Sequence, residues 1–215
     1  MRRLLSDTAS GLLAGILIAI GGSVFLACYS ITDLLPRAVG ALLFSVALLC
    51  ICHKGYSLFT GKVGFLPEKH DKEAFRVLFT GLFGNLVAAY LCGIALRYAI
   101  PSIGKTAELL CDAKDAESLP SALIRAVFCG ILMYLAVSIY KEKKTVAAIF
   151  FCIPTFILAG FEHSIADAFY FSAAGLAVRW QTILYLAVVL LGNSLGGMLF
   201  PLLSMIRPKK EKEQS

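Results

Sequence analysis

The stretch Gly160-Phe161-Glu162-His163-Ser164 places two ionisable side chains inside an apolar run that extends from Thr145 to Phe171. Ionisable residues are costly at membrane depth, and they usually face a bundle interior or a water-filled path. The glycine is suited to end one half-helix, and the serine is suited to help start another. A helix broken near mid-bilayer is typical of a solute site. The pattern therefore favours a transport site over a core histidine that is hydrogen-bonded within a helix bundle.

The composition around this stretch is that of a membrane protein. The chain has 215 residues, of which 59% are hydrophobic, and its mean hydropathy is +0.80. A soluble domain is about 45–50% apolar. We therefore predict an all-α integral membrane protein with a single membrane domain over residues 1–215, of which 207–215 form a cytoplasmic tail.

Six apolar segments can be distinguished, and a spanning helix needs about 20 residues. They are Thr8–Thr32, Ala38–Cys52, Val77–Leu96, Ala126–Tyr140, Thr145–Phe171 and Gln181–Ile206. If both termini are cytoplasmic, most of the 20 Lys and Arg residues fall on the inner side, as the positive-inside rule requires. We expect a multi-pass protein of the cell's inner or plasma membrane, with no nucleic-acid partner.

The seven cysteines indicate no metal site and no cofactor. Cys50 and Cys52 match neither zinc nor redox spacing. Six of the seven lie within apolar segments, where cysteine behaves as a small hydrophobic residue. We predict no disulfide framework.

The second apolar segment also has a break. Gly55, Gly61, Gly64 and Pro67 follow it within a stretch that stays apolar, and they are incompatible with one continuous helix. Irregular apolar backbone is tolerated where it is buried in protein or lines a cavity. The segment reads either as a half-helix followed by a re-entrant loop or as an ordinary cytoplasmic turn.

A Gly-Asn pair recurs in the third and sixth segments, as Gly84-Asn85 and Gly192-Asn193. The order helix, broken segment, Gly-Asn helix thus occurs twice, at about 8–96 and 121–206. Each half has three spans, so the second half is inverted relative to the first, as in many transporters. This 3+3 repeat favours the re-entrant loop, and it places Thr60 and His163 near the midplane.

Two further segments carry weaker signals. Gly11-x-x-x-Gly15 in the first helix predicts a close helix approach. The long connection from Arg97 to Arg125 has mixed charges, so from its pattern alone we expect a solvated loop with Lys114 as one of its surface charges.

These motifs together resemble the formate/nitrite transporter family, pentameric anion channels with an aquaporin-like protomer of six helices. The resemblance covers nearly the whole chain. It rests on Gly160 to Ala166 after Ile153-Pro154-Thr155, on Leu58-Phe59-Thr60-Gly61, on the two Gly-Asn pairs and on Leu135-Ala136-Val137.

The resemblance implies a role for each matching residue. His163 would be the central pore histidine, Thr60 would face it, and Lys114 would be the vestibule lysine that attracts the anion. Apolar constrictions would lie on either side of the centre. The implied pore residues are Phe44, Leu48 and Phe59 on one side and Phe156 on the other, together with Asn193 of the sixth-helix pair and Asp167.

The chain departs from the family pattern at several positions. Gly130 replaces an asparagine, so His163 would lack that polar neighbour, and Lys62 replaces another. Asp167 stands where asparagine is usual, one helical turn after His163. It could approach the imidazole and hold it as a cation, or it could face the protomer interface and pair with Arg179 or a backbone amide.

The resemblance implies a homopentamer, to which Gly11, Gly15 and the charge-free first and sixth segments would contribute. Each protomer would conduct small monovalent anions of weak acids, formate or nitrite foremost, as the anion or as the neutral acid. A channel for a neutral solute such as water or ammonia is the alternative, although the paired Asn-Pro-Ala motifs of aquaporins are missing. A membrane enzyme is disfavoured, because no second histidine, Ser-Lys pair or metal cluster accompanies His163 at depth.

Overall fold

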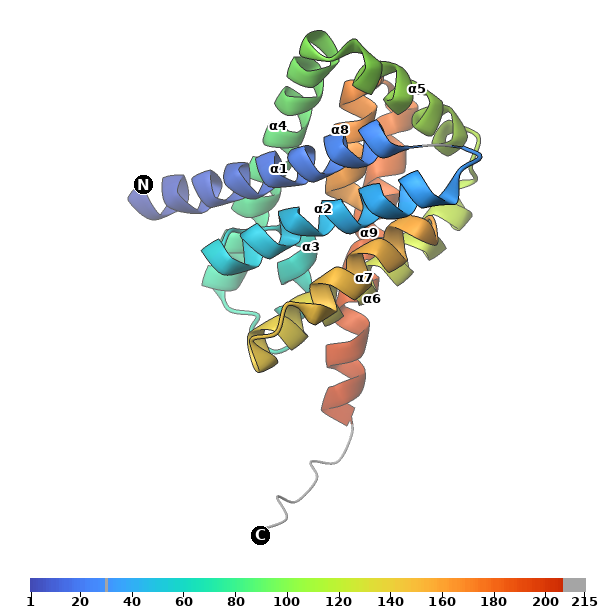
Figure 1. The fold of residues 1–215 in the computed structure, drawn as a ribbon. Helices are drawn as coiled ribbons and strands as arrows, with labels where there is room; N and C mark the ends of the chain where they lie inside the picture. The colour runs from blue at the N-terminus through green and yellow to red at the C-terminus, as the bar shows by residue number, and fades with distance from the viewer. Residues whose placement is uncertain (30, 207–215) are drawn as a thin grey trace.

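The computed structural model describes residues 1–29 and 31–206, and all secondary-structure elements in this part of the chain are helical (Figure 1). The predicted tail, 207–215, lies outside the described residues. The elements in chain order are α1 (Arg2–Cys28), α2 (Leu34–Lys54), α3 (Phe59–Lys62), the 3-10 turn η1 (Val63–Phe65), α4 (Lys72–Ala99), α5 (Pro101–Asp115), α6 (Leu119–Lys143), α7 (Ala147–Leu158), α8 (Ser164–Ala173) and α9 (Trp180–Ile206).

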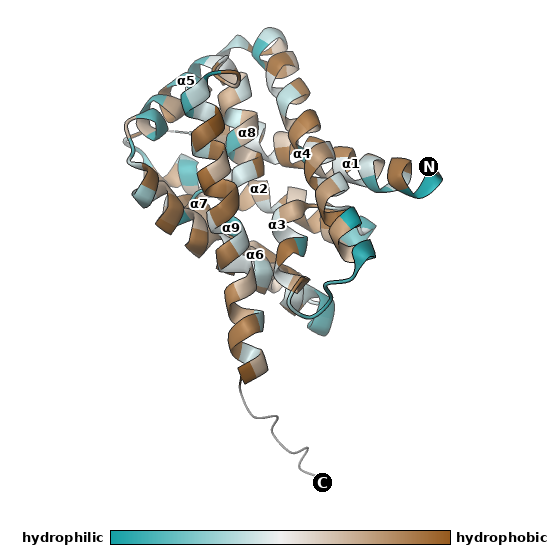
Figure 2. Ribbon diagram, turned by 180° about the vertical axis from the view of Figure 1, so that it is seen from behind, coloured by the Kyte–Doolittle hydropathy of each residue, from teal (hydrophilic) through white to brown (hydrophobic). Residues whose placement is uncertain are grey.

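Within the described residues, five helices are long and apolar enough to cross a membrane, namely α1, α2, α4, α6 and α9. Hydrophobic residues predominate along α4 and α9 (Figure 2). Many of their large apolar side chains are exposed. Phe79 and Phe83 on α4, for example, are 59% and 62% exposed in the single chain. The chain is therefore a multi-pass membrane protein. The shorter helices α7 and α8 together make the broken fifth segment, and the count of six spans stays a prediction.

The first half of the chain is built on close packing of α1 against α4. A Cβ atom added at Gly11 would lie 2.5 Å from the carbonyl oxygen of Gly81, and one at Gly15 would lie 2.6 Å from that of Asn85. The predicted close helix approach is thus confirmed. It occurs inside one chain, however, so the use of Gly11 and Gly15 as evidence for a contact between protomers was wrong.

The second half is built in the same way on α6 and α9. A Cβ atom at Gly130 on α6 would lie 2.3 Å from the carbonyl oxygen of Asn193 on α9. The space beside Gly130 is filled by backbone, and no side chain fits there without moving a helix. Glycine at position 130 therefore permits the close contact between α6 and α9, and its effect on His163 stays a prediction.

The connection between Arg97 and Arg125 is not a solvated loop, because it contains α5. Ile103, Ala107 and Cys111 recur at intervals of four residues and form a buried face. This face packs against α8 and α4. Charged residues between the apolar positions made this helix difficult to recognise in the sequence. Lys114 lies in the last turn of α5 and is buried.

Both predicted helix breaks are present, and both begin with the same backbone motif. Gly55 after α2 and Gly160 after α7 have φ angles of 70° and 73°. The N–H of Tyr56 donates to the Ile51 carbonyl at 3.0 Å, and that of Phe161 donates to the Phe156 carbonyl at 2.9 Å. These are Schellman ends, which glycine adopts without steric cost.

The segment after the first break folds back into the protein. Phe59, Thr60 and Gly61 of α3 are buried, and so are Val63 and Gly64 of η1. A cytoplasmic turn would leave these residues exposed. The re-entrant interpretation of this segment is thus confirmed.

Candidate functional site

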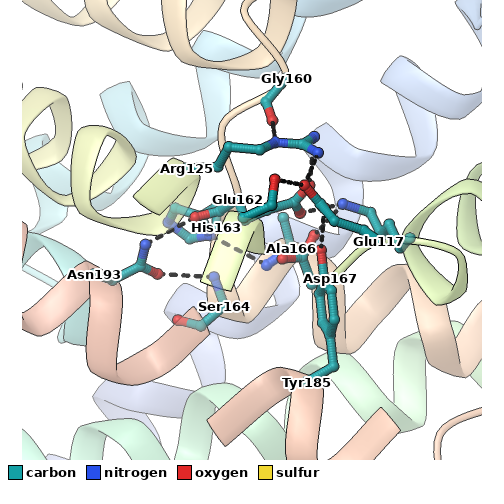
Figure 3. Close-up of polar contacts among 12 residues, drawn as sticks. Glu117, Arg125, Gly160, Glu162, His163, Ser164, Ala166, Asp167, Tyr185 and Asn193 are labelled. Atoms are coloured by element: carbon teal, nitrogen blue, oxygen red, sulfur yellow. Dashed lines mark hydrogen bonds and ion pairs between the residues drawn. The ribbon is translucent and has the colours of Figure 1, made fainter. Parts of the chain in front are cut away.

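Asn193 on α9 holds the second break in place (Figure 3). Its Oδ1 accepts a hydrogen bond from the Ser164 N–H at 2.9 Å. Its Nδ2 donates to the carbonyl oxygens of Glu162 at 2.8 Å and Ala126 at 2.9 Å. All of these partners belong to the protein backbone, and Asn193 is fully buried. Asn193 thus positions the break, whereas the resemblance implied a pore residue.

Asn85 on α4 does the same for the first break. Its Oδ1 accepts from the Phe59 N–H at 2.9 Å, and its Nδ2 donates to the Ser57 and Gly11 carbonyls, each at 2.8 Å. Phe59 begins α3, as Ser164 begins α8. The matched contacts support an inverted repeat, whose limits at about 8–96 and 121–206 stay a prediction.

His163 lies at the start of α8 and bonds through both ring nitrogens. Its Nδ1 accepts a hydrogen bond from the Ala166 N–H at 3.2 Å, so His163 caps the helix. The sequence had suggested Ser164 for this role. The Nε2 atom lies 2.9 Å from the Thr60 hydroxyl oxygen. Since Nδ1 accepts, the neutral ring carries its proton on Nε2 and donates it to Thr60.

An aromatic layer covers one side of the imidazole. The Phe156 ring stacks on His163 with the ring centroids 5.7 Å apart and the planes 18° apart. The Phe44 ring meets Phe156 edge-on at 6.4 Å. Phe44 and Phe156 therefore belong to the same constriction, and their predicted placement on opposite sides of the centre was wrong.

The apolar residues on the other side are Leu48 and Leu58. Both are 1% exposed, and both line a cavity on the α3 side. Phe59, which was predicted here, packs in a separate cluster with Val63 and Leu78. Leu58 is the extended residue before α3 and Phe59 is the first residue of that helix. The sequence motif alone could not decide which of the two side chains faces the cavity.

Two cavities approach the buried centre from opposite ends. The first, which we name the α5 vestibule, has a volume of about 220 Å³ and reaches Phe156, His163 and Lys114. The second, the α3 vestibule, has a volume of about 160 Å³ and reaches Leu48, Leu58 and Gly61. Phe44 and Thr60 line neither cavity and are buried between them. A buried layer that contains Phe44, Phe156, Thr60 and His163 thus lies between the two cavities.

Lys114 enters the α5 vestibule and forms ion pairs with Glu162 and, at 3.0 Å, with Asp167. The two acids are 1% and 2% exposed. Burial opposes the charge of Lys114, but the carboxylates of Asp167 and Glu162 outweigh burial and raise the pKa of this ammonium above its ordinary value. Lys114 is therefore charged, and its charge is already compensated by protein groups.

Asp167 has a different partner from either of those expected. Its carboxylate pairs with Lys114, and in the described part of the chain the His163 ring hydrogen-bonds to Thr60 and Ala166 instead. Arg179 pairs with Asp115 instead, at 3.1 Å. The tertiary structure brought in Lys114, which lies far from Asp167 in sequence.

Arg125, Glu117 and Glu162 extend this charged cluster, and none of them was predicted as a site residue (Figure 3). Arg125 on α6 forms ion pairs with Glu117 and, at 2.8 Å, with Glu162. The Tyr185 hydroxyl donates to Glu117 at 3.3 Å. The signal for Glu162 was present in the sequence, because it lies in an apolar run beside His163.

Comparisons with known proteins agree with this geometry. The formate/nitrite transporter family model matches residues 2–206. A formate-nitrite transporter of Plasmodium falciparum is 30% identical over 181 residues, which cover 72% of this chain and 58% of the relative. A nitrite transporter of Salmonella typhimurium is 25% identical over 222 residues, which cover 89% of this chain and 78% of the relative.

A solved structure described as a pentameric formate channel with formate bound has the same fold, with a TM-score of 0.80 at 23% identity. The match covers 95% of this chain and 96% of that one. The chain spans a little over half the length of the Plasmodium relatives, about 58% of each of the first three. Since the family model matches nearly the whole chain, from α1 to the end of α9, the chain belongs to the formate/nitrite transporter family.

Proposed function

We propose that this protein is a channel for small monovalent anions of weak acids, with formate and nitrite as the first candidates. Each protomer of a homopentamer contains one path, in the cell's inner or plasma membrane, with both termini cytoplasmic. The path runs from the α5 vestibule past Phe44, Phe156, His163 and Thr60 to Leu48 and the α3 vestibule. The protein moves its substrate without chemical conversion.

The observation that carries the proposal is the buried layer between the two vestibules, in which Thr60 and His163 form a hydrogen-bonded pair beside the rings of Phe156 and Phe44. An ion entering such a layer loses hydration worth several kcal/mol. A low dielectric raises the pKa of an entering weak acid. The neutral acid therefore crosses more easily than its anion.

His163 and Thr60 supply the polar contact in this layer. Because Nδ1 of His163 caps α8, the Nε2–H is the ring group available to the path. It donates to Thr60, and the Thr60 hydroxyl can donate its own hydrogen to an oxygen of the permeating acid. The pair thus replaces part of the lost hydration. The imidazole polarises the Thr60 hydroxyl, while the proton of the neutral acid comes from water in the vestibule.

The names of the relatives support this class of substrate. Several are described as formate-nitrite transporters, one as a nitrite transporter and a structural neighbour as a formate channel. The charged residues of the α5 vestibule, including Lys114, Arg125 and Glu162, further suit an ionic substrate over glycerol or water.

The test is stopped-flow flux into proteoliposomes. Formate, nitrite, hydrosulfide, acetate and lactate are compared with glycerol at two pH values, with protein-free liposomes as the control. We expect at least one of these anions to enter faster than in the control, and faster at the lower pH. Glycerol flux that exceeds every anion flux would overturn the proposal and support a neutral-solute channel.

A further inference from the structure

We propose that Lys62 and Lys141 form a binding site for a small monovalent anion at the mouth of the α3 vestibule. This site captures the permeating anion on the α3 side of the path. Lys114 lies at the other end of the path, and its charge is compensated by carboxylates, unlike the charges of Lys62 and Lys141. The inference rests on the proposed function, since it concerns the same path.

The two lysines stand between two chambers. Both line the α3 vestibule, which reaches Leu48 and Leu58. Both also line a neighbouring cavity of about 300 Å³, which extends outward to Lys69 and Glu73. An anion that moves from the outer cavity toward the apolar constriction therefore passes the ammonium groups of Lys62 and Lys141.

Each lysine is held by a contact with a neutral group of the protein. Lys62 Nζ donates to the Ser57 hydroxyl at 3.0 Å, and Ser57 is anchored through its N–H to the Ser10 hydroxyl at 2.9 Å. Lys141 Nζ lies 3.6 Å from the centroid of the Phe65 ring, in a cation–π contact. An ammonium has three donors, so both groups keep donors for an anion.

The charges of these lysines are not compensated by contact. In the described part of the chain, no carboxylate lies within 4.0 Å of either ammonium. Asp7 and Glu73 pair with Arg76, at 2.9 and 3.6 Å. Glu68 and Asp7 act on the lysines only through longer-range electrostatics.

Lys114 at the other end of the path shows the contrast, because it contacts two buried carboxylates. Two nearby like charges repel each other, and an anion bound between Lys62 and Lys141 relieves this repulsion. Uncompensated charge in a chamber with apolar walls also raises the local anion concentration. The geometry therefore points to capture of the anion from the α3 side.

The experiment measures formate flux at low ionic strength in proteoliposomes containing Lys62→Gln, Lys141→Gln or both. Lys143→Gln is the matched control, since it removes one charge from the same end of α6 and lines neither cavity. We expect each single variant to raise the half-saturating formate concentration at least ~5-fold, with a larger rise in the double variant. The control stays within about twofold of the parent.

Salt and a charge-retaining variant complete the test. Added salt raises the half-saturating concentration of the parent and leaves that of the double variant nearly unchanged. Lys62→Arg keeps the parent's value and shows that charge, not packing, is responsible. A parent that conducts formate while both single variants match Lys143→Gln would overturn this inference. A parent without formate flux would instead count against the proposed function.

Discussion

Asn85 and Asn193 carry matching sets of hydrogen bonds at the two helix breaks. Each side-chain oxygen accepts from the first N–H of a half-helix, Phe59 of α3 or Ser164 of α8, at 2.9 Å. Each side-chain nitrogen donates to the carbonyl oxygen two residues before the half-helix begins, that of Ser57 or Glu162, at 2.8 Å. It also donates to a carbonyl oxygen of the neighbouring long helix, α1 or α6. One amide thus satisfies the backbone groups that a broken helix leaves unpaired.

Replacing either asparagine should therefore destabilise the protein strongly. Asn85→Ala and Asn193→Ala each leave buried backbone groups without partners, at a cost of about 3 kcal/mol. We expect a clear fall in the melting midpoint of the purified protein in detergent. Ser194→Ala is the control, because the Ser194 hydroxyl bonds only within its own helix, to Leu190. An Asn193→Ala midpoint equal to that of the control would contradict this account.

Thr60→Val should lower formate flux with little effect on folding. The change keeps the shape of the side chain but removes the hydroxyl that His163 Nε2 faces at 2.9 Å. Losing a buried hydrogen-bond partner costs about 1–3 kcal/mol, so flux should fall at least ~10-fold. Thr60→Ser retains the hydroxyl and should conduct nearly as well as the parent. If the valine variant conducts at the parent's rate, Thr60 contributes packing alone.

His163→Phe should abolish pH-dependent flux while assembly continues. The variant loses the ring that hydrogen-bonds to Thr60 in the buried layer, and it loses the cap on α8, which costs about 1 kcal/mol. Flux is compared between about pH 5 and 8, because a free imidazole titrates near 6.5. An unchanged pH profile would make His163 a core residue with no part in conduction.

Asp167→Asn should make the α5 vestibule more positive. Lys114 then faces one carboxylate instead of two, so the half-saturating formate concentration should fall several-fold. Lys114→Met should do the opposite, since it leaves Asp167 without its cation and Glu162 with Arg125 alone, at a cost of about 3–5 kcal/mol. Flux and melting midpoints of both variants give the readout. Equal formate affinity in Asp167→Asn and the parent would argue against charge compensation.

The same ion pairs give a pH expectation. The pKa of Lys114 is raised in the folded protein, so its stabilising contribution is fully present below the ordinary lysine value of about 10.4 and is lost only above it. Between pH 5 and 9 this cation should therefore add no pH dependence to the melting midpoint.

Gly130→Ala should disrupt the packing of α6 against α9. The new Cβ would lie 2.3 Å from the Asn193 carbonyl oxygen, so the helices must separate, which costs about 3 kcal/mol or more. Gly55→Ala is an informative comparison, because φ is 70° there but nothing lies within 4 Å of the added atom. It should cost about 1–2 kcal/mol. Melting midpoints that rank these variants in the reverse order would contradict the packing argument.

The pentamer can be checked by native mass spectrometry in detergent. We expect the homopentamer of the proposed function, with the exposed apolar side chains of the long helices available for contacts between protomers. A stable monomer or trimer would count against the proposed assembly.

The sequence by itself determined the class of the protein and the places where its helices break. Hydropathy identified the membrane helices, because the bilayer requires long apolar segments. Gly160 and Gly55 marked the breaks, because only glycine readily adopts a positive φ. The recurrence of Gly-Asn also identified Asn85 and Asn193, although their role as anchors of the breaks was not foreseen.

The tertiary structure alone decided which side chains meet. Lys114 and Asp167 are distant in sequence, and only the packing of α5 on α8 brings them within 3.0 Å. Likewise, the backbone at the first break places Leu58 on the α3 vestibule and its neighbour Phe59 in a separate cluster. Periodicity and motifs describe local backbone, whereas charge pairing and pore lining depend on the spatial arrangement of helices that are far apart in the chain.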